Sequence, residues 1–221
     1  MMWQAVFLSL QVSAVATICA LPLAIWVAHV LARKQFRGHG LLNGLVHLPL
    51  VLPPVVTGYL LLIVFGKQGA VGGFLYDWFG ITLAFRWTGA ALAAAIMGFP
   101  LMVRAIRLGF EAVDVGLEDA ARTLGASRAR VFGTVTLPLV MPAILAGAVL
   151  GFAKALGEFG ATITFVAAIP GQTQTIPSAI YGLLQVPNQE SDVIVLVSIS
   201  VALAMGALVA SEWLARRMVA R

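Results

Sequence analysis

Charged side chains are scarce in this chain: Asp, Glu, Lys and Arg make up 10% of its 221 residues, and 61% of the residues are apolar. A soluble domain of this length carries far more charge. The composition therefore excludes an ordinary soluble globular protein and indicates a single integral membrane domain over residues 1–221. The net charge of +5 does not indicate a nucleic-acid partner, because the basic residues fall between hydrophobic segments.

Groups that could perform chemistry are equally sparse. The only cysteine, Cys19, lies in an apolar stretch, so a disulfide within the chain is excluded. The sequence has no phosphate-binding loop of the form G-x-x-x-x-G-K-[ST]. It also has no His, Cys or carboxylate cluster with metal-ligand spacing and no nucleophile pattern, so it gives no positive case for an enzyme.

Long apolar runs dominate what is present. Five segments suit membrane spans of roughly 20 residues each, so an all-α integral membrane fold with five transmembrane helices is expected. The first is too long for a signal-peptide core and is expected to be retained. Pro53 and Pro54 interrupt the second, and a membrane tolerates such a break only where protein or water satisfies the freed backbone groups. The expected helices cover residues 5–32, 48–65, 87–107, 138–159 and 193–214.

The distribution of cations predicts the orientation. Most basic residues follow the first, third and fifth apolar segments, whereas the other side holds only Lys67 and Arg86. By the positive-inside rule the N-terminus is expected outside and the C-terminus in the cytoplasm. The cytoplasmic cations are then Arg33, Lys34, Arg37, Arg104, Arg107, Arg122, Arg128, Arg130, Arg216, Arg217 and Arg221.

The most polar stretch lies between the third and fourth apolar segments, within a predicted cytoplasmic loop over residues 111–137. Good helix formers with acids at their start predict a short helix from Asp119 to Leu124. Gly125 is well placed to end this helix in a left-handed turn. A second short helix is expected over 127–136, before Pro138 starts the return into the membrane.

One charged pair falls inside the fourth apolar segment. Lys154 and Glu158 are four residues apart and share one helix face. Charge within a membrane is costly and usually faces a partner or a pathway. The pair either neutralises itself and fixes helix packing, or it lines a route for a solute. Glu158 repels an anion, so Lys154 or the nearby backbone is the better candidate for attracting an oxyanion.

The polar stretch resembles the EAA loop of ABC importer permeases, which reads Glu-Ala-Ala, three residues, Gly, nine residues, Ile, one residue, Leu-Pro. Here Asp119 replaces the glutamate and Val135 replaces the isoleucine, and the spacing is the same throughout. The resemblance implies a coupling helix that docks in a groove on a separate ATPase. The residues expected to take part are Glu118, Asp119, Ala120, Ala121, Thr123, Leu124 and Gly125.

The segment from Gly157 to Thr162 resembles the GEFGA segment of molybdate, tungstate and sulfate permeases. Further stretches are similar to the molybdate members of this family: residues 48–56, 76–81, 99–107, 169–171 and 175–181. The resemblance covers nearly the whole chain and implies a type I ABC importer permease of the bacterial inner membrane. The residues expected along the translocation pathway are Pro53, Pro54, Lys154, Gly157, Glu158, Gly160 and Thr162.

The same resemblance implies partners. They are a second copy of the chain, two ATPase subunits that use ATP and Mg²⁺, and a periplasmic molybdate-binding protein, with no cofactor in this chain. Sulfate, thiosulfate and tungstate remain alternative substrates because the GEFGA segment is shared. Two alternatives from other classes of protein remain open: one repeat of a secondary transporter, and a membrane scaffold. The first would show a second, inverted unit, which this sequence lacks, and the second would bind no ATPase.

Overall fold

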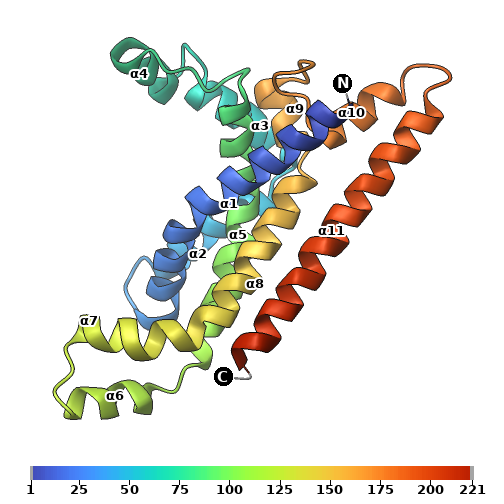
Figure 1. The fold of residues 1–221 in the computed structure, drawn as a ribbon. Helices are drawn as coiled ribbons and strands as arrows, with labels where there is room; N and C mark the ends of the chain where they lie inside the picture. The colour runs from blue at the N-terminus through green and yellow to red at the C-terminus, as the bar shows by residue number, and fades with distance from the viewer. Residues whose placement is uncertain (1, 220–221) are drawn as a thin grey trace.

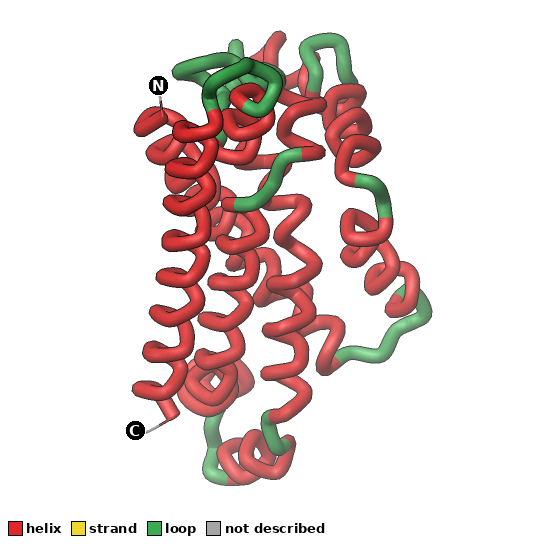
Figure 2. Tube along the Cα trace, turned by 90° about the vertical axis from the view of Figure 1, so that its right-hand side faces the viewer, coloured by secondary structure: helices red, strands yellow, loops and turns green. Residues whose placement is uncertain are grey.

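The structure, a computed structural model, describes residues 2–219 without the side chains of residues 211, 212 and 214–219. Within this part of the chain every regular element is a helix, and the long helices lie side by side (Figures 1 and 2). The long helices are α1 (Met2–Arg33), α5 (Trp87–Ala112), α8 (Leu137–Leu156) and α11 (Glu190–Val219). Each is long and apolar enough to cross a membrane, and a bent helix pair brings the candidate spans of the described chain to five.

The bent pair consists of α2 (His39–Val51) and α3 (Pro54–Phe65), which meet at an angle of 113°. Leu52 is extended, with ψ of 142°, because the ring of the following proline disfavours the helical conformation. Pro54 opens α3 at a position where no backbone N–H is needed. The hydrophobic run predicts one helix over 48–65, whereas the structure shows two helices and a start at His39. The break lies at the proline pair, and Pro49 lies inside α2.

Small side chains hold the centre of the bundle together. In α1 the fully buried Ala24 and Ala28 are one turn apart and face α5. Where α5 meets α8, a Cβ on Gly98 would lie 3.2 Å from the carbonyl oxygen of Gly151, so the two backbones almost touch. A Cβ on Gly151 would collide with the side chain of Met102. Without a hydrophobic force in lipid, such close approach supplies the packing energy.

The last helix, α11, is the least buried of the candidate spans. It contacts α8 and the short helix α10 (Ile176–Leu183) and forms one edge of the molecule in Figure 1. Leu196 is fully buried there, whereas Ile194 and Val201 are exposed. In a membrane, lipid or another subunit covers the exposed apolar side.

The two ends of the bundle differ. The end near residue 2 carries α4 (Ala70–Phe79), α9 (Gly160–Val166) and α10, and the opposite end carries α6 (Val115–Thr123), α7 (Arg128–Val131) and the end of α11 (Figure 1). Ile176 ties α10 to α1 by donating its N–H to the Ser9 hydroxyl at 2.7 Å. The polar stretch therefore lies at the end of the molecule opposite to residue 2.

Several helix bounds differ from the sequence expectation. The third helix extends to Ala112, and the fourth begins as α7 at Arg128 and ends at Leu156. The residues after Leu156 turn into α9 because Gly157 leaves the helix and Phe159 is non-helical. Of the cations used for the orientation, the side chains of Arg216 and Arg217 and the whole of Arg221 lie outside the described residues.

Candidate functional site

The helix α6 is held by caps at both ends. Asp114 precedes it, and its side chain accepts a hydrogen bond from the Gly116 N–H at 2.8 Å. At the other end Gly125 has φ of +85°, the left-handed conformation expected from the sequence. The Ala126 N–H then reaches back to the Ala121 carbonyl at 3.1 Å, which satisfies a terminal helix carbonyl. The chain is thereby turned sharply from α6 into α7.

The segment after this turn is continuous with a membrane helix. Ser127 caps α7, and the π-helix η1 (Phe132–Thr136) joins α7 directly to α8. The sequence predicts a separate short helix over 127–136, whereas the structure joins this segment to α8 without a loop. The helix bends at the junction, since α7 lies across the end of the bundle and α8 runs along it (Figures 1 and 2). Pro138 has no N–H and its ring presses on the carbonyl four residues earlier, so the wider π turn accommodates it. No loop therefore separates α7 from the membrane helix.

Glu118 joins α6 to the membrane helices. Its Oε1 accepts hydrogen bonds from Arg33 Nη2 of α1 at 3.2 Å and from the Thr136 hydroxyl of η1 at 2.8 Å. Arg122 Nη2 lies 3.6 Å from its Oε2. The residue is 8% exposed, so it faces the bundle and does not belong to the outer surface of α6. Its position suits holding the coupling helix rather than touching a partner.

The remaining residues of the EAA resemblance lie toward solvent. Asp119 is exposed and pairs with Arg122 at 2.9 Å, and the Thr123 hydroxyl donates to the Ala120 carbonyl at 2.7 Å. Leu124 is 89% exposed, which leaves a large apolar side chain at the tip of the segment. We call this surface the coupling face. It consists of Asp119, Ala120, Thr123, Leu124 and Gly125, with Ala121 half-buried beside it.

The second set of predicted residues lies near the other end of the bundle. Glu158 is 2% exposed, and its Oε2 lies 2.5 Å from Lys154 Nζ. Its Oε1 accepts the Ala161 N–H at 3.0 Å in the first turn of α9, and the Thr162 hydroxyl donates to the Phe159 carbonyl of the same turn at 2.9 Å. Lys154 is partly exposed. The pair thus supports local packing, while the lysine still reaches the surface.

The structure brings the proline pair and the start of α9 together. A Cβ on Gly160 would lie 2.6 Å from the Cβ of Pro54, so the start of α9 rests on the start of α3. One turn further, a Cβ on Gly58 would lie 2.5 Å from the Ala161 carbonyl oxygen. Pro53 and Gly157 are exposed beside this crossing. The proline pair and the glycine-rich segment therefore form one structural unit, although about 100 residues separate them.

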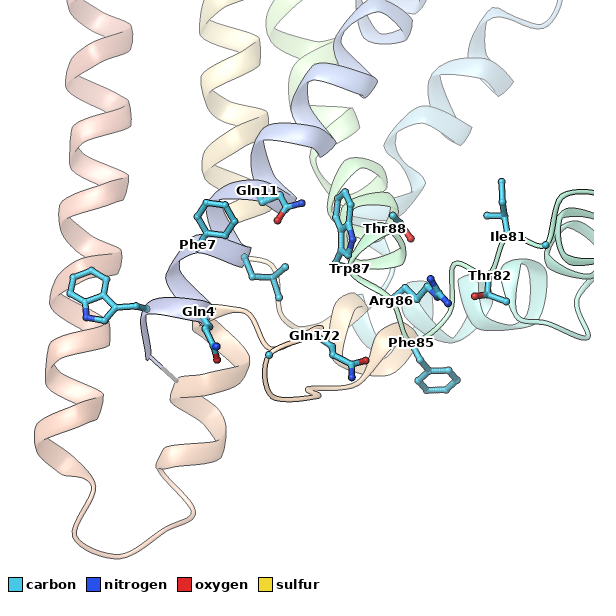
Figure 3. A pocket seen from close by; sticks show the side chains of 14 residues that line it. Gln4, Phe7, Gln11, Ile81, Thr82, Phe85, Arg86, Trp87, Thr88 and Gln172 are labelled. Carbon is cyan, nitrogen blue, oxygen red and sulfur yellow. The ribbon is translucent and has the colours of Figure 1, made fainter.

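A cavity at the same end was not predicted from the sequence. It has a volume of about 970 Å³ and combines aromatic rings with three glutamines, as Figure 3 shows. Gln4 and Gln11 are seven residues apart in α1, so they share one face, and Gln172 approaches from the loop before α10. Arg86 provides the cation. The spacing of the two glutamines is the one feature in the sequence that could have indicated this cavity. It gives no indication that the loop with Gln172 lies opposite them.

No group of three or more His, Cys, Asp or Glu side chains that could hold a metal ion occurs among the described residues.

The fold defines the class of protein. A solved bacterial alginate ABC transporter, crystallised with a periplasmic protein that carries an alginate pentasaccharide, matches with a TM-score of 0.74 at 17% identity. The match covers 97% of this chain and 78% of that one. The fold is therefore that of the membrane subunits of type I ABC importers.

The family follows from the sequence comparison. The model of the binding-protein-dependent transport system inner membrane component matches residues 20–220, and the chain belongs to this family. It is a multi-pass component of an inner-membrane transport system, not an enzyme, as expected from the sequence.

Individual relatives are similar over almost the whole chain. The molybdenum transport system permease protein ModB of Escherichia coli K12 is 63% identical over 214 residues, which cover 97% of this chain and 93% of the relative. The ModB protein of Haemophilus influenzae is 55% identical over the same shares. A sulfate transport system permease protein, CysT of Salmonella typhimurium, is 38% identical over 72% of this chain and 57% of its own length.

Proposed function

We propose that the chain is the membrane-spanning subunit of an ATP-driven molybdate importer. The observation that carries this proposal is the 63% identity to a molybdenum permease over 97% of the chain. Identity to the sulfate permease is lower and covers less of the chain. Sulfate and thiosulfate are therefore the second candidates, and tungstate is a third because its size and charge are nearly those of molybdate.

The proposal includes a second copy of the chain. Pro53, Pro54 and Gly157 lie exposed on the surface of one bundle, so one copy does not enclose a pathway. Two copies that face each other across these residues would enclose a pathway between them. Lys154, at the rim of the same region and partly exposed, would attract the dianion, while the buried Glu158 and Thr162 hold the turn of α9 beside Gly160.

Transport would follow from moving helices against each other. A periplasmic binding protein selects the anion and delivers it to the outer end of the bundle. On the inner side two ATPases hold the coupling faces, with ATP and Mg²⁺ bound in those partner chains. When the ATPases close, α6 and α7 move with them, and the helical segment of α7, η1 and α8, which no loop interrupts, transmits the movement into the membrane. Tight binding within this subunit is not required and would slow release.

The test is transport by the complete complex in proteoliposomes. The permease and ATPase are reconstituted with the binding protein outside, and molybdate uptake is measured with and without internal ATP. The proposal predicts ATP-dependent molybdate uptake. An excess of tungstate should reduce this uptake, and the same excess of sulfate should leave it unchanged. Sulfate uptake without molybdate uptake would contradict the substrate but keep the transporter class.

The pathway assignment has its own test. Lys154→Ala leaves Glu158 buried without its cation and will lower stability, so the double variant Lys154→Ala with Glu158→Gln is measured beside it. If Lys154 attracts the anion, both variants show slower uptake at limiting molybdate. Normal uptake by a stable double variant would leave only the packing role.

A further inference from the structure

A pocket of about 620 Å³ lies where α1 ends above α6 and α7. We call it the basic pocket, and the residues that line it come from the end of α1, from α6 and from the start of α7. They are His29, Ala32, Arg33, Lys34, Val115, Glu118, Arg122 and Arg128. No step of the transport mechanism above uses this pocket.

The charge of the basic pocket is strongly positive. Four cationic side chains face a single carboxylate, Glu118, which Arg33 and Arg122 already share. Lys34 and Arg128 have no acidic partner among the described residues. Cations brought together from segments about 90 residues apart repel one another unless an anion joins them, so the pocket suits a ligand of negative charge.

Two of the residues that line the pocket each have a buried nitrogen atom without a hydrogen-bond partner in the described structure. The atoms are Nδ1 of His29 and Nε of Arg33. The Arg33 Nη2 is already engaged, since it donates to Glu118 and to the Val113 carbonyl, both at 3.2 Å. Buried polar atoms are normally satisfied, so water or a ligand is expected beside them. Arg128, which has no carboxylate partner among the described residues, offers a guanidinium group that matches phosphate oxygens.

The location of the pocket points to the source of the anion. Trp26, His29 and Arg33 follow one another at spacings of three and four, so they lie along one face of α1. Trp26 is 62% exposed, so a large aromatic side chain lies on the outside of the bundle, as is typical of residues at a membrane interface. The pocket lies next to it at the end of α1, which is where headgroups are expected if α1 spans the membrane. Basic pockets at this boundary suit anionic lipid headgroups.

The face of α6 that lines the pocket is not the coupling face. Val115, Glu118 and Arg122 recur at spacings of three and four and line the pocket, and of the three Glu118 alone is buried. Asp119 and Leu124 are not among the lining residues. A partner docked on the coupling face would therefore leave the pocket accessible to lipid, which favours a lipid over an acidic segment of the ATPase.

We propose that the basic pocket binds the phosphate group of an anionic phospholipid from the inner leaflet. Lys34 and Arg128 would contact the phosphate, with Arg33 Nε and His29 lining the inner wall. The acyl chains would lie along α1 beside Trp26. The lipid would bridge α1 to the start of α7 and hold the coupling segment in place, whichever oxyanion the protein transports.

The test uses the permease–ATPase complex, purified in detergent and stripped of lipid. Native mass spectrometry measures bound lipid as phosphatidylglycerol is added stepwise, with phosphatidylcholine as the zwitterionic comparison. The pocket variant is Lys34→Gln with Arg128→Gln. Its matched control is Arg37→Gln with Arg130→Gln, which removes the same charge two or three residues away, outside the pocket. A conservative variant, Lys34→Arg with Arg128→Lys, checks that the fold tolerates changes here.

The proposal predicts that the pocket variant binds phosphatidylglycerol about tenfold more weakly, because Lys34 and Arg128 would contact the phosphate directly, whereas Arg37 and Arg130 lie outside the pocket. The control and the conservative variant should stay within about twofold of the parent protein. Equal loss in pocket variant and control, or none in either, would overturn the proposal. Displacement of the lipid by millimolar inorganic phosphate would assign the pocket to a free anion. Loss of the ATPase from the pocket variant with unchanged lipid binding would assign it to a protein partner.

Discussion

Glu118 accepts hydrogen bonds from two membrane-associated elements, so one carboxylate fixes how α6 sits beneath the bundle. The sequence places this residue in the coupling motif, but the motif does not reveal that it faces inward. Its partners Arg33 and Thr136 are 85 and 18 residues away, and only the tertiary fold brings them together. By contrast, the role of Gly125 was predictable, because a glycine after a run of helix formers is a local signal.

Replacement of Glu118 should destabilise the coupling segment. Glu118→Ala removes charged hydrogen bonds to Arg33 and Thr136 and leaves two arginines facing each other, at a cost of about 2 kcal/mol. Asp119→Ala is the control, because its exposed pair with Arg122 is worth only about 0.5 kcal/mol. We expect Glu118→Ala to lower the thermal unfolding midpoint of the complex clearly more than Asp119→Ala. Equal midpoints for the two variants would contradict the role assigned to Glu118.

Gly125 tests the turn between α6 and α7. No atom lies within 4 Å of where its Cβ would be, so only the backbone conformation opposes a side chain there. Gly125→Val should cost about 2 kcal/mol in the left-handed conformation, whereas Gly125→Asn tolerates it. Co-purification of the ATPase and molybdate uptake should fall in the valine variant and persist in the asparagine variant. Normal docking and uptake with valine would refute this account of the turn.

At the scale of elements, hydrophobic runs predicted the membrane helices, and the proline pair marked the break between α2 and α3. The runs could not predict the 113° angle at this break, because it depends on contacts of α3 with the distant α9. They also missed η1 and its continuity with α8. A polar stretch of helix and a following apolar stretch have different compositions, yet no loop separates them.

The crossing of α3 and α9 can be tested with one methyl group. At Gly58 the added Cβ would lie 2.5 Å from the Ala161 carbonyl oxygen, so Gly58→Ala forces the helices apart at a cost of about 1–3 kcal/mol. Gly44→Ala in α2 meets no atom within 4 Å and is the matched control. We expect a lower unfolding midpoint and slower uptake only for Gly58→Ala. Equal behaviour of the two variants would show that the crossing is loose.

For the whole molecule, the opposite placement of residue 2 and α6 agrees with the orientation predicted from the cations, which remains a prediction. The orientation can be tested by cysteine labelling, because the chain has a single native cysteine to remove. In a Cys19→Ala background, Gln68→Cys in the exposed loop before α4 should react with a membrane-impermeant maleimide on intact spheroplasts. Arg130→Cys should react only after permeabilisation. The reverse pattern would mean that the coupling face lies outside, away from any ATPase.

The sequence also carried the anion assignment only by resemblance, since no physical property of the residues separates molybdate from sulfate. Both are tetrahedral dianions, and Lys154 would attract either. The cavity with Gln4, Gln11 and Gln172 was missed because its walls come from α1 and from segments far away in the sequence. Selectivity therefore has to be measured on the assembled transporter.

The most direct measurement is cellular molybdenum in a strain that lacks this chain, grown at limiting molybdate with sulfate in excess. The account predicts a sharp loss of molybdenum that the intact gene restores and Gly125→Val does not. Unchanged molybdenum together with impaired sulfate uptake would contradict the proposed substrate and move the chain to sulfate transport. Unchanged levels of both anions would contradict the proposed transport function itself.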